Sequence, residues 1–447
     1  MNPEKLKCET TMIERTYTHE ITPEDDGEEV SVAGWAHEIR DLGGITFIVI
    51  RDREGQIQAT FKEDRNEELF EKAQEVGKED LVHVRGTVDE TDQAPGNREL
   101  QPTSLEIIGE SESPLPMDIS KDIDSDLSTR LDNRFMDLRQ PEIHAIFSLR
   151  SHLIQSMEEW FDDRGYIDIE TPTIAKMGAE GGAELFPVIY YDQEAFLSQS
   201  PQLYKQMLMA AGFDKVYKTG TAFRAEEFAT SRHVSEISMF DVELAFIEDQ
   251  HDVMDVVENS LRYTLKETKE RAEDDLEVLD IDLTVPEDDF PRIKFEEARR
   301  ILKEEYDHIP DDEGDLDTEG EQLLGEHFME QGHPAVFIVG YPGEKFYYGE
   351  AREEDEYQSR RFDMLYKGLE LVSGGQREHD PDRLMRKVEE EGIDPEDISF
   401  YLESFKFGMP PHGGYGLGLD RLVKQVANLD NIKEAILFPR TPDRLEP

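Results

Sequence analysis

The stretch FRAEEFATSRHVSEISMFDVE, residues 223 to 243, places a cationic loop between two strand-like segments. The preceding KVYKTGTAFR and the following SEISMFDVELAFI are rich in β-branched and aromatic residues, which favours strands. The loop brings two arginines and a histidine around an acid, at Arg224, Glu226, Arg232 and His233. Guanidinium groups bind phosphate oxygens through paired hydrogen bonds, so this loop suits a triphosphate.

Two later strings carry further polar residues. In ELVSGGQREH, residues 370 to 379, Glu370 and Ser373 could share a hard cation, and Arg377 could hold a carboxylate. In GMPPHGGYGLGLDRL, residues 408 to 422, Arg421 begins a helix beside small residues that let a flat base approach. A single arginine is usually a surface residue. Three arginines in separate Gly- or Phe-flanked strings, in a chain poor in bases, favour a binding site.

The string LSQSPQLYKQMLMA, residues 197 to 210, contains one isolated cation. Leu203, Met207 and Ala210 fall at helical spacing, whereas Lys205 is the only charge and lies among glutamines. A solvated helix face is the simple interpretation, and a lysine that faces a ligand is the alternative. The neighbouring strings favour the ligand.

Several other functions fit poorly. The glycines of GYGLGLDR, residues 414 to 421, lie too close to the C-terminus for a dinucleotide fingerprint, and no P-loop string occurs. Residues 315 to 326 nearly match a calcium loop, but a helix starting at Glu319 and capped by Thr318 explains them better. Cys8 is the only cysteine, and no Ser/His/Asp or Cys/His constellation is visible.

The chain of 447 residues has a net charge of −56, from 104 acids and 48 bases. Its acids lie in segments that keep helical or strand periodicity, which argues for a folded chain. At about 1 M salt the Debye length is roughly 3 Å, so such a surface suits a halophile. The sequence shows no secretory signal and no apolar run of membrane-spanning length. We therefore expect a cytosolic protein without a membrane partner.

The N-terminal quarter predicts a small β-barrel. Five short strands occupy residues 28 to 110, and the helical segment NEELFEKAQEVG follows the third. This order is typical of an OB-type barrel, which commonly binds oligonucleotides, although a barrel without a ligand has the same pattern. Residues 111 to 140 are polar with weak periodicity and indicate a hinge. From Pro141 a long amphipathic helix and the strand YIDIETPTI open an α+β domain.

Three of these strings, in order, resemble the motifs of class II aminoacyl-tRNA synthetases. GYIDIETPTI resembles motif 1, FRAEEFATSRHVSE motif 2 and GGYGLGLDRL motif 3. The order and the barrel resemble the aspartyl/asparaginyl/lysyl subgroup from Met12 onward, and the ending AILFPRTPDRLEP resembles its archaeal aspartyl branch. The resemblance implies an α+β chain: an OB-fold anticodon-binding domain over 12–110, a hinge over 111–140 and a catalytic domain over 141–447. This domain would be built on an antiparallel sheet flanked by helices, and residues 1–11 would form a disordered extension.

The resemblance also assigns roles to residues. Catalysis would fall to Arg224 and Arg421, which stabilise the charge that develops on ATP. Mg²⁺ would bind Glu370 and Ser373. The ATP site would comprise Arg224, Glu226, Arg232, His233, Glu370, Gly418 and Arg421, and the aspartate site Glu180 in a Gly-rich loop, Gln202, Lys205, Arg224, Asp241, Ser373 and Arg377. Lys205 and Arg377 would clamp the side-chain carboxylate and so favour aspartate over asparagine.

In the barrel, the resemblance assigns the anticodon to Arg40, Phe47 and Gln58. Relatives that accept only tRNA(Asp) tend to carry Trp at the position of His37 and Lys near Pro95. This chain therefore resembles the form that also charges tRNA(Asn), which would pass Asp-tRNA(Asn) to an amidotransferase. A homodimer would form through motif 1. The alternatives are an enzyme strict for tRNA(Asp), an asparaginyl enzyme and a non-catalytic paralogue.

Overall fold

The computed structural model describes residues 13–117, 119, 125–178, 184–226, 230–343, 346–352 and 355–447. It divides between His144 and Ala145 into two compact units, which are treated separately below. The predicted boundaries at residues 110 and 140 stay predictions, and the predicted extension over 1–11 lies outside the described residues. Among the described residues, no helix is both long and apolar enough to cross a membrane.

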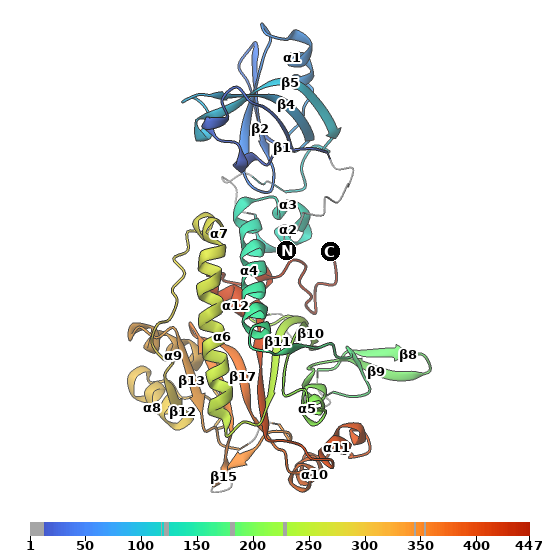
Figure 1. The fold of residues 1–447 in the computed structure, drawn as a ribbon, viewed down its shortest axis with the longest axis vertical. Coiled ribbons are helices and arrows are strands. Elements are labelled where there is room, and N and C mark those ends of the chain that lie inside the picture. Colours follow the sequence, from blue (N-terminus) through green and yellow to red (C-terminus); the bar gives the residue numbers. More distant parts are fainter. Residues whose placement is uncertain are drawn as a thin grey trace, which may run out of the picture. The chain divides into compact units, whose positions relative to one another are not determined.

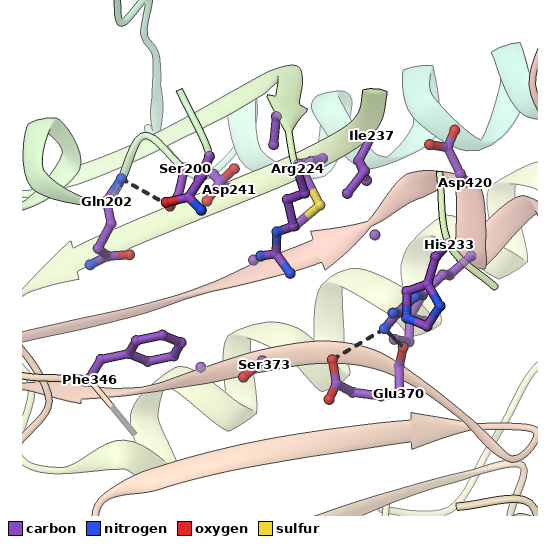
Figure 2. A pocket seen from close by; sticks show the side chains of 18 of the residues that line it. Ser200, Gln202, Arg224, His233, Ile237, Asp241, Phe346, Glu370, Ser373 and Asp420 are labelled. Atoms are coloured by element: carbon purple, nitrogen blue, oxygen red, sulfur yellow. Dashed lines mark hydrogen bonds and ion pairs between the residues drawn. The ribbon is translucent and has the colours of Figure 1, made fainter. Parts of the chain in front are cut away.

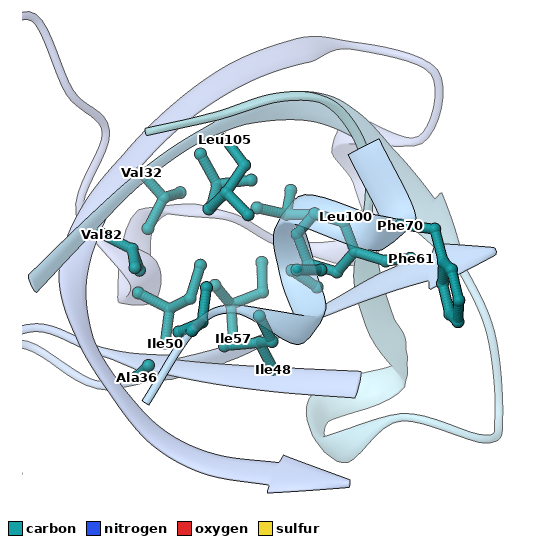
Figure 3. Close-up of a cluster of buried hydrophobic side chains, with 14 of the residues drawn as sticks. Val32, Ala36, Ile48, Ile50, Ile57, Phe61, Phe70, Val82, Leu100 and Leu105 are labelled. Atoms are coloured by element: carbon teal, nitrogen blue, oxygen red, sulfur yellow. The ribbon is translucent and has the colours of Figure 1, made fainter. Parts of the chain in front are cut away.

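The N-terminal unit contains a closed barrel of five strands in the order β1-β2-β3-β5-β4. Alternate side chains such as Ile48 and Ile50 are fully buried inside it (Figure 3). Asn66 begins α1, because its side chain accepts from the Leu69 N–H. The bounds are β1 Glu29–Asp41, β2 Ile45–Arg51, β3 Gln56–Lys62, α1 Glu67–Gln74, β4 Leu81–Glu90 and β5 Arg98–Gly109.

The predicted hinge contains two short helices, α2 (Leu127–Asp132) and α3 (Arg134–Asp137). Asp126 caps the first by accepting from the Thr129 N–H. Arg134 is only 1% exposed and pairs with Asp137 inside the second. With six and four residues, these helices are too short for an apolar periodicity to show in the sequence.

The second unit is built on an eight-stranded sheet in the order β12-β13-β16-β17-β18-β11-β10-β6. Its neighbours pair antiparallel except β12–β13 and β10–β6. The predicted α+β fold with an antiparallel-rich sheet is confirmed. The bounds are β6 Ile167–Asp168, β10 Lys215–Phe223, β11 Glu236–Ala245, β12 Arg292–Lys294, β13 Ala335–Val339, β16 Arg361–Tyr366, β17 Leu369–Arg377 and β18 His412–Gly418.

The predicted strand YIDIETPTI is two very short strands. β6 pairs with β10, whereas β7 (Ile174–Ala175) joins β9 (Gln193–Leu197) and β8 (Pro187–Tyr190) in a separate small sheet. Pro172 lies between them and has no N–H to offer a ladder, so the chain leaves one sheet before it enters the next. β14 (Ala351–Arg352) and β15 (Asp355–Ser359) form a further pair.

Two long helices, α4 (Pro141–Asp162) and α6 (Gln250–Arg271), cover one face of the large sheet (Figure 1). Phe161 on α4 packs on Phe240, whose centroid is 5.0 Å away, and Ser260 on α6 approaches the Tyr415 hydroxyl. Phe240 and Tyr415 alternate with Asp241 and Gly416, which therefore point to the opposite face. Short α7 (Glu273–Val278) follows α6.

The opposite face is covered at its two ends. α8 (Phe295–Tyr306) and α9 (Thr318–Glu330) share a core with β13, and α5 (Gln202–Ala210), α10 (Pro381–Glu390) and α11 (Ser399–Phe405) share another with β10. α12 (Leu419–Val426) follows β18 directly. The predicted cap of α9 is wrong by one residue: Asp317, not Thr318, accepts from the Gly320 N–H. A carboxylate caps as well as a hydroxyl, and the local sequence does not separate them.

Candidate active site

One row of the large sheet places polar side chains on the face between these two groups of helices. Asp363, Ser373, Gly416, Asp241 and Lys218 are successive partners across β16, β17, β18, β11 and β10. Residues directly opposite each other on neighbouring strands point to the same face. Gly416, at the centre, has no side chain to fill the space above it. The row therefore forms a polar floor with a gap in the middle.

The middle of this floor, Ser373, Gly416 and Asp241, lines a cavity of about 420 Å³. In Figure 2, Gln202 and Asp241 lie towards one end, the amino-acid end, and His233 and Glu370 towards the other, the phosphate end. Glu180 lies outside the described residues, and Lys205 is not part of the lining. The predicted residues that do line the cavity are Gln202, Arg224, Glu226, Arg232, His233, Asp241, Glu370, Ser373, Arg377, Gly418 and Arg421.

Lys205 is buried beneath the amino-acid end. Its side chain is 1% exposed, and Nζ donates to Asp241 Oδ1 over 2.8 Å. Nζ also lies 3.6 Å from Glu243 Oε2 and 3.4 Å from the Tyr415 carbonyl oxygen. The lone charge of its helix thus has two acidic partners from β11. Asp241 lines the cavity and Lys205 supports it from below, so direct contact between Lys205 and a substrate stays a prediction.

Arg377 reaches the cavity from β17 and is held by Glu243. Its Nε donates to Glu243 Oε1 over 3.1 Å, and a terminal nitrogen donates to Gln202 Oε1 over 3.4 Å. Burial alone would raise the pKa of the Glu243 carboxyl, but Arg377 and Lys205 bring it below its usual value. A Cβ at Gly414 would lie 2.3 Å from Glu243 Oε2, so only glycine leaves room for this carboxylate. Two cations and two carboxylates therefore balance at this end.

A neutral histidine anchors Gln202. His412 Nδ1 lies 2.9 Å from the Pro410 carbonyl, which can only accept, so Nε2 accepts from the Gln206 amide over 2.9 Å. Burial lowers the pKa of His412 to about 4, which keeps the ring uncharged at neutral pH. Gln206 Oε1 in turn accepts from Gln202 over 3.0 Å and from the Tyr401 hydroxyl over 3.2 Å. This chain of hydrogen bonds fixes the Gln202 amide at the cavity wall.

At the phosphate end, two arginines contact two acids. Arg421 on α12 donates to the Glu370 carbonyl over 2.7 Å and to its Oε1 over 3.2 Å. Arg232 donates over 3.1 Å to Glu321 Oε2, which also accepts from the Glu370 N–H over 3.2 Å. Glu370 is three residues before Ser373 and would face away in a regular strand. A shift in register between β16 and β17 returns it to the cavity face.

The acids at this end crowd one another. Burial and the neighbouring Glu370 raise the pKa of Glu321 to about 7. The same two causes raise the pKa of Asp363, although Arg361 and a hydrogen bond from Ser373 oppose them. Such crowding indicates a site that favours an added cation.

The predicted Mg²⁺ site fits this chemistry. Within the described ranges, no group of three or more His, Cys, Asp or Glu side chains is arranged to hold a metal ion. Mg²⁺, however, is usually bound through one or two carboxylates together with substrate phosphates. Glu370 and Ser373, with phosphate oxygens of ATP as the other ligands, meet that requirement.

The described residues of the loop between β10 and β11 include Arg224, Glu226, Arg232 and His233, which line this end. The Arg224 N–H donates to the Ser235 carbonyl over 3.0 Å, and His233 Nδ1 lies 2.8 Å from the Thr230 hydroxyl. Burial lowers the pKa of His233; Glu226 opposes this, and nearby arginines reinforce it. The uncharged ring suits contact with a flat base, beside the charges predicted to bind phosphates.

Sequence reasoning missed Glu243 and Glu321. Glu243 could have been found, because it lies two residues after Asp241 on a strand and so shares its face. Glu321 has no local signal: its partner Arg232 is 89 residues away. Ser200 and Glu184 line the cavity itself, unlike Glu243 and Glu321, and were given no role from the sequence.

In the barrel, the three predicted anticodon residues share one outer face. Arg40 pairs with Phe47 across β1 and β2, and Gln58 pairs with Val49, two residues along β2. The Gln58 amide nitrogen donates to Glu99 Oε2 over 2.9 Å. Its oxygen and its second amide N–H are therefore left to contact a base.

The two predicted discrimination residues differ in their surroundings. Pro95 is exposed in the 3₁₀ turn Pro95–Asn97, whereas the His37 side chain is 14% exposed and belongs to a network. Arg51 donates to His37 Nδ1 over 2.7 Å and to Glu79 Oε2 over 2.8 Å. Arg139 donates to the same carboxylate oxygen over 2.9 Å. The hydrogen bond from Arg51 therefore fixes the His37 side chain at the edge of the barrel.

Two family models match the chain. Residues 126–442 match the class II tRNA synthetases of the D, K and N group, and residues 30–108 match the OB-fold nucleic acid binding domain. The two matches fall on the large sheet with its helices and on the barrel, respectively.

Similar proteins cover nearly the whole chain. An aspartate–tRNA(Asp/Asn) ligase from Methanopyrus kandleri is 47% identical over 98% of this chain and 100% of its own length. An aspartate–tRNA(Asp) ligase from Pyrococcus furiosus is 46% identical with the same coverage. The crystal structure of asparaginyl-tRNA synthetase from Pyrococcus horikoshii with asparaginyl-adenylate superposes with a TM-score of 0.90 at 36% identity, over 98% of this chain and 100% of that chain.

Proposed function

The chain belongs to the class II tRNA synthetases of the D, K and N group, and from this premise we propose that it is an aspartate–tRNA ligase. It activates L-aspartate with ATP and transfers the aspartyl group to the 3′ end of tRNA in the cytoplasm. The observation that carries the choice of amino acid is the pair of buried cations, Lys205 and Arg377, at one end of the cavity. A pocket for lysine would need acids in excess there, and a pocket for asparagine needs no second cation.

The charge balance of this end explains selectivity for a carboxylate. Asp241 and Glu243 hold the two cations in place before substrate arrives, so the site costs little to organise on binding. Aspartate adds a side-chain carboxylate for the Arg377 guanidinium and an ammonium group for Asp241 and Gln202. Asparagine would offer the guanidinium a neutral amide oxygen in place of a carboxylate, and a charge-assisted hydrogen bond is roughly twice as strong as a neutral one.

The reaction runs in two displacements. An α-carboxylate oxygen of aspartate attacks the α-phosphorus of ATP, the bond to the β-phosphate oxygen breaks, and pyrophosphate leaves. The terminal ribose hydroxyl of tRNA then attacks the activated carbonyl and loses its proton, and AMP leaves. No protein nucleophile takes part, so Arg224 and Arg421 act by position and charge. Mg²⁺ held with Glu370 and Ser373 would neutralise the outer phosphates.

We propose that the barrel accepts the anticodons of both tRNA(Asp) and tRNA(Asn). His37 is smaller than a tryptophan and is fixed by Arg51, and Pro95 has neither a side-chain donor nor an N–H. Neither group supplies a contact that favours one base at the third anticodon position. Asp-tRNA(Asn) formed in this way would pass to an amidotransferase.

A homodimer through motif 1 is also proposed. Ile167 in β6 and Ile174 in β7 are each 45% exposed, and Pro172 lies between them. A symmetric contact between two copies would bury these apolar side chains. Light scattering at high salt should give twice the mass of one chain, and a single-chain mass would contradict the proposal.

The function is tested by ATP–pyrophosphate exchange with aspartate or asparagine as the amino acid. Exchange that depends on aspartate and is at least a hundredfold weaker with asparagine is expected. Exchange with neither amino acid would indicate a non-catalytic paralogue, and preference for asparagine would overturn the assignment.

The tRNA range is tested by charging both transcripts at matched salt. Comparable rates are expected, and a preference above about a hundredfold for tRNA(Asp) would indicate the strict enzyme. If both are charged, His37→Trp with Pro95→Lys should shift charging towards tRNA(Asp).

A further inference from the structure

The two buried cations at the amino-acid end distinguish a carboxylate from an amide, but they do not distinguish aspartate from glutamate. Glutamate carries the same ionised groups and is longer by one methylene group. A binding site separates two such molecules through its length, since the extra methylene must displace one of the bound groups. Here the length is the distance from Asp241 and Gln202, which face the ammonium group in the proposed complex, to Arg377, which faces the side-chain carboxylate.

Glu243, Gln202 and Tyr348 restrict the Arg377 guanidinium. Its Nε donates to Glu243, and a terminal nitrogen donates to Gln202. The ring of Tyr348 adds a contact of another kind, because its centroid lies 5.6 Å from the Arg377 Cζ, within the roughly 6 Å reach of a cation–π interaction. A longer substrate would have to push the guanidinium aside, and Tyr348 occupies the space next to it.

The main chain fixes Tyr348 relative to Arg377. Gly349 pairs with Arg377 in an antiparallel bridge at the end of β17. The Tyr348 carbonyl accepts from the Glu378 N–H over 2.9 Å, and the Gly349 N–H donates to the Phe346 carbonyl over 3.0 Å. The first bond joins the segment to β17, and the second closes a tight turn within it. The position of the Tyr348 ring is therefore set by backbone hydrogen bonds on both sides of it.

Phe346 supports the Tyr348 ring. The two rings are stacked, with centroids 5.1 Å apart and planes inclined by 7°. Both line the large cavity, and Phe346 lies towards the same end as Gln202 (Figure 2). Tyr348 is only 3% exposed and shares a hydrophobic cluster with Leu203. A ring that is stacked on a neighbour and packed into a core forms a rigid wall beside Arg377.

We propose that Tyr348, supported by Phe346, is a positioning residue that excludes glutamate from the aspartate site. This role rests on the proposed function and adds to it the choice between two acidic amino acids. Because the ring keeps Arg377 in place, glutamate that reaches the guanidinium has its ammonium group displaced from Asp241 and Gln202. Its α-carboxylate is then displaced from the α-phosphorus of ATP as well, and a misplaced nucleophile reacts slowly.

The test measures ATP–pyrophosphate exchange of Tyr348→Ala and Phe346→Ala with aspartate and with glutamate. In Tyr348→Ala, the ratio of kcat/KM for aspartate to that for glutamate should fall roughly ten- to two-hundredfold, the range by which a pocket distinguishes one methylene. Phe346→Ala removes only the stacked support, so the ratio should fall by roughly two- to tenfold. The matched control is Phe400→Ala, whose ring is 42% exposed on α11 and does not line the large cavity. Its ratio should match wild type.

The ratio separates positioning from a structural role, since a destabilised fold lowers exchange with both amino acids alike. Tyr348→Phe keeps the ring and should keep the wild-type ratio. An unchanged ratio in Tyr348→Ala, or an equal loss with both amino acids, would overturn the proposal. Should Tyr348→Ala fail to fold, Phe346→Ala decides, and an unchanged ratio there would overturn it. Absence of aspartate-dependent exchange in the wild type would instead refute the proposed function.

Discussion

The two ends of the large cavity treat charge in opposite ways. At the amino-acid end, Lys205 and Arg377 are paired with Asp241 and Glu243, and the pKa of the Glu243 carboxyl is lowered despite complete burial. At the phosphate end, Glu321 crowds against Glu370, and its pKa is raised to about 7. Both ends pair two cations with two acids, yet the pKa of the buried carboxyl is lowered at one end and raised at the other.

This difference between the two ends indicates how each of them accommodates the charge of its substrate. A balanced end keeps its cations paired and in place until a zwitterion with one extra carboxylate arrives. An end with crowded acids and arginines prepares for a ligand that arrives with its own cations, as ATP does. Three variants test this contrast, in order of decreasing expected effect.

Lys205→Met removes the cation beneath the amino-acid end. Asp241 and Glu243 then lose a buried partner, and breaking a buried pair costs about 3–5 kcal/mol. We expect aspartate-dependent exchange to fall roughly a hundred- to a thousandfold, together with a lower melting temperature. The control is Lys215→Met, since Lys215 is exposed at the start of β10. Near-wild-type exchange in Lys205→Met would show that this end does not depend on its buried cation.

Arg421→Ala removes a cation from the phosphate end. Arg421 holds both the carbonyl and the carboxylate of Glu370, and in the proposed reaction it also faces the charge that develops on the leaving phosphate. Removing one such donor typically costs about a hundredfold or more in rate. We expect kcat of exchange to fall by that factor, while the melting temperature hardly changes. Arg386→Ala, at an exposed position on α10, is the control, and an equal loss there would contradict a specific role.

Glu321→Gln tests the contrast through the pH dependence of the KM for ATP. Below pH 7 Glu321 is largely protonated and releases Arg232 to the phosphates; above pH 7 it is ionised, competes for Arg232 and repels ATP. The KM for ATP should therefore rise as pH increases from 6 to 8 in the wild type, by up to about tenfold for one titrating group. Glu321→Gln should flatten this dependence. An unchanged pH profile would show that Glu321 has no influence on ATP.

The barrel offers a separate comparison, because its function depends on an exposed face rather than on buried charge. Phe47→Ala should raise the KM for tRNA by roughly tenfold, through the loss of stacking on one base, and leave exchange intact. Leu42→Ala, at a side chain that is 73% exposed on the neighbouring turn, is the control. Unchanged tRNA kinetics in Phe47→Ala would remove Phe47 from recognition.

Much of the fold and of the candidate site could be predicted from the sequence alone. The barrel followed from alternating apolar residues and turns, since that pattern is local and its core is apolar. The cationic loop, the Glu370 string and the Arg421 string identified most of the cavity lining, because each places its polar residues within a short segment. The two hinge helices were not predicted, since segments of six and four residues are too short to show an apolar period.

Only the tertiary structure decided how these residues are paired. It showed that Asp241 lines the cavity while Lys205 lies beneath it, and it brought Glu321 to Arg232 and Glu243 to Arg377 across 89 and 134 residues of chain. It also brought the rings of Tyr204 on α5 and Phe400 on α11 together, from helices that are far apart in sequence. Charge and burial act over a few ångströms in space, whatever the separation along the chain. Strand register and helix packing set those distances, and a string of residues does not contain them.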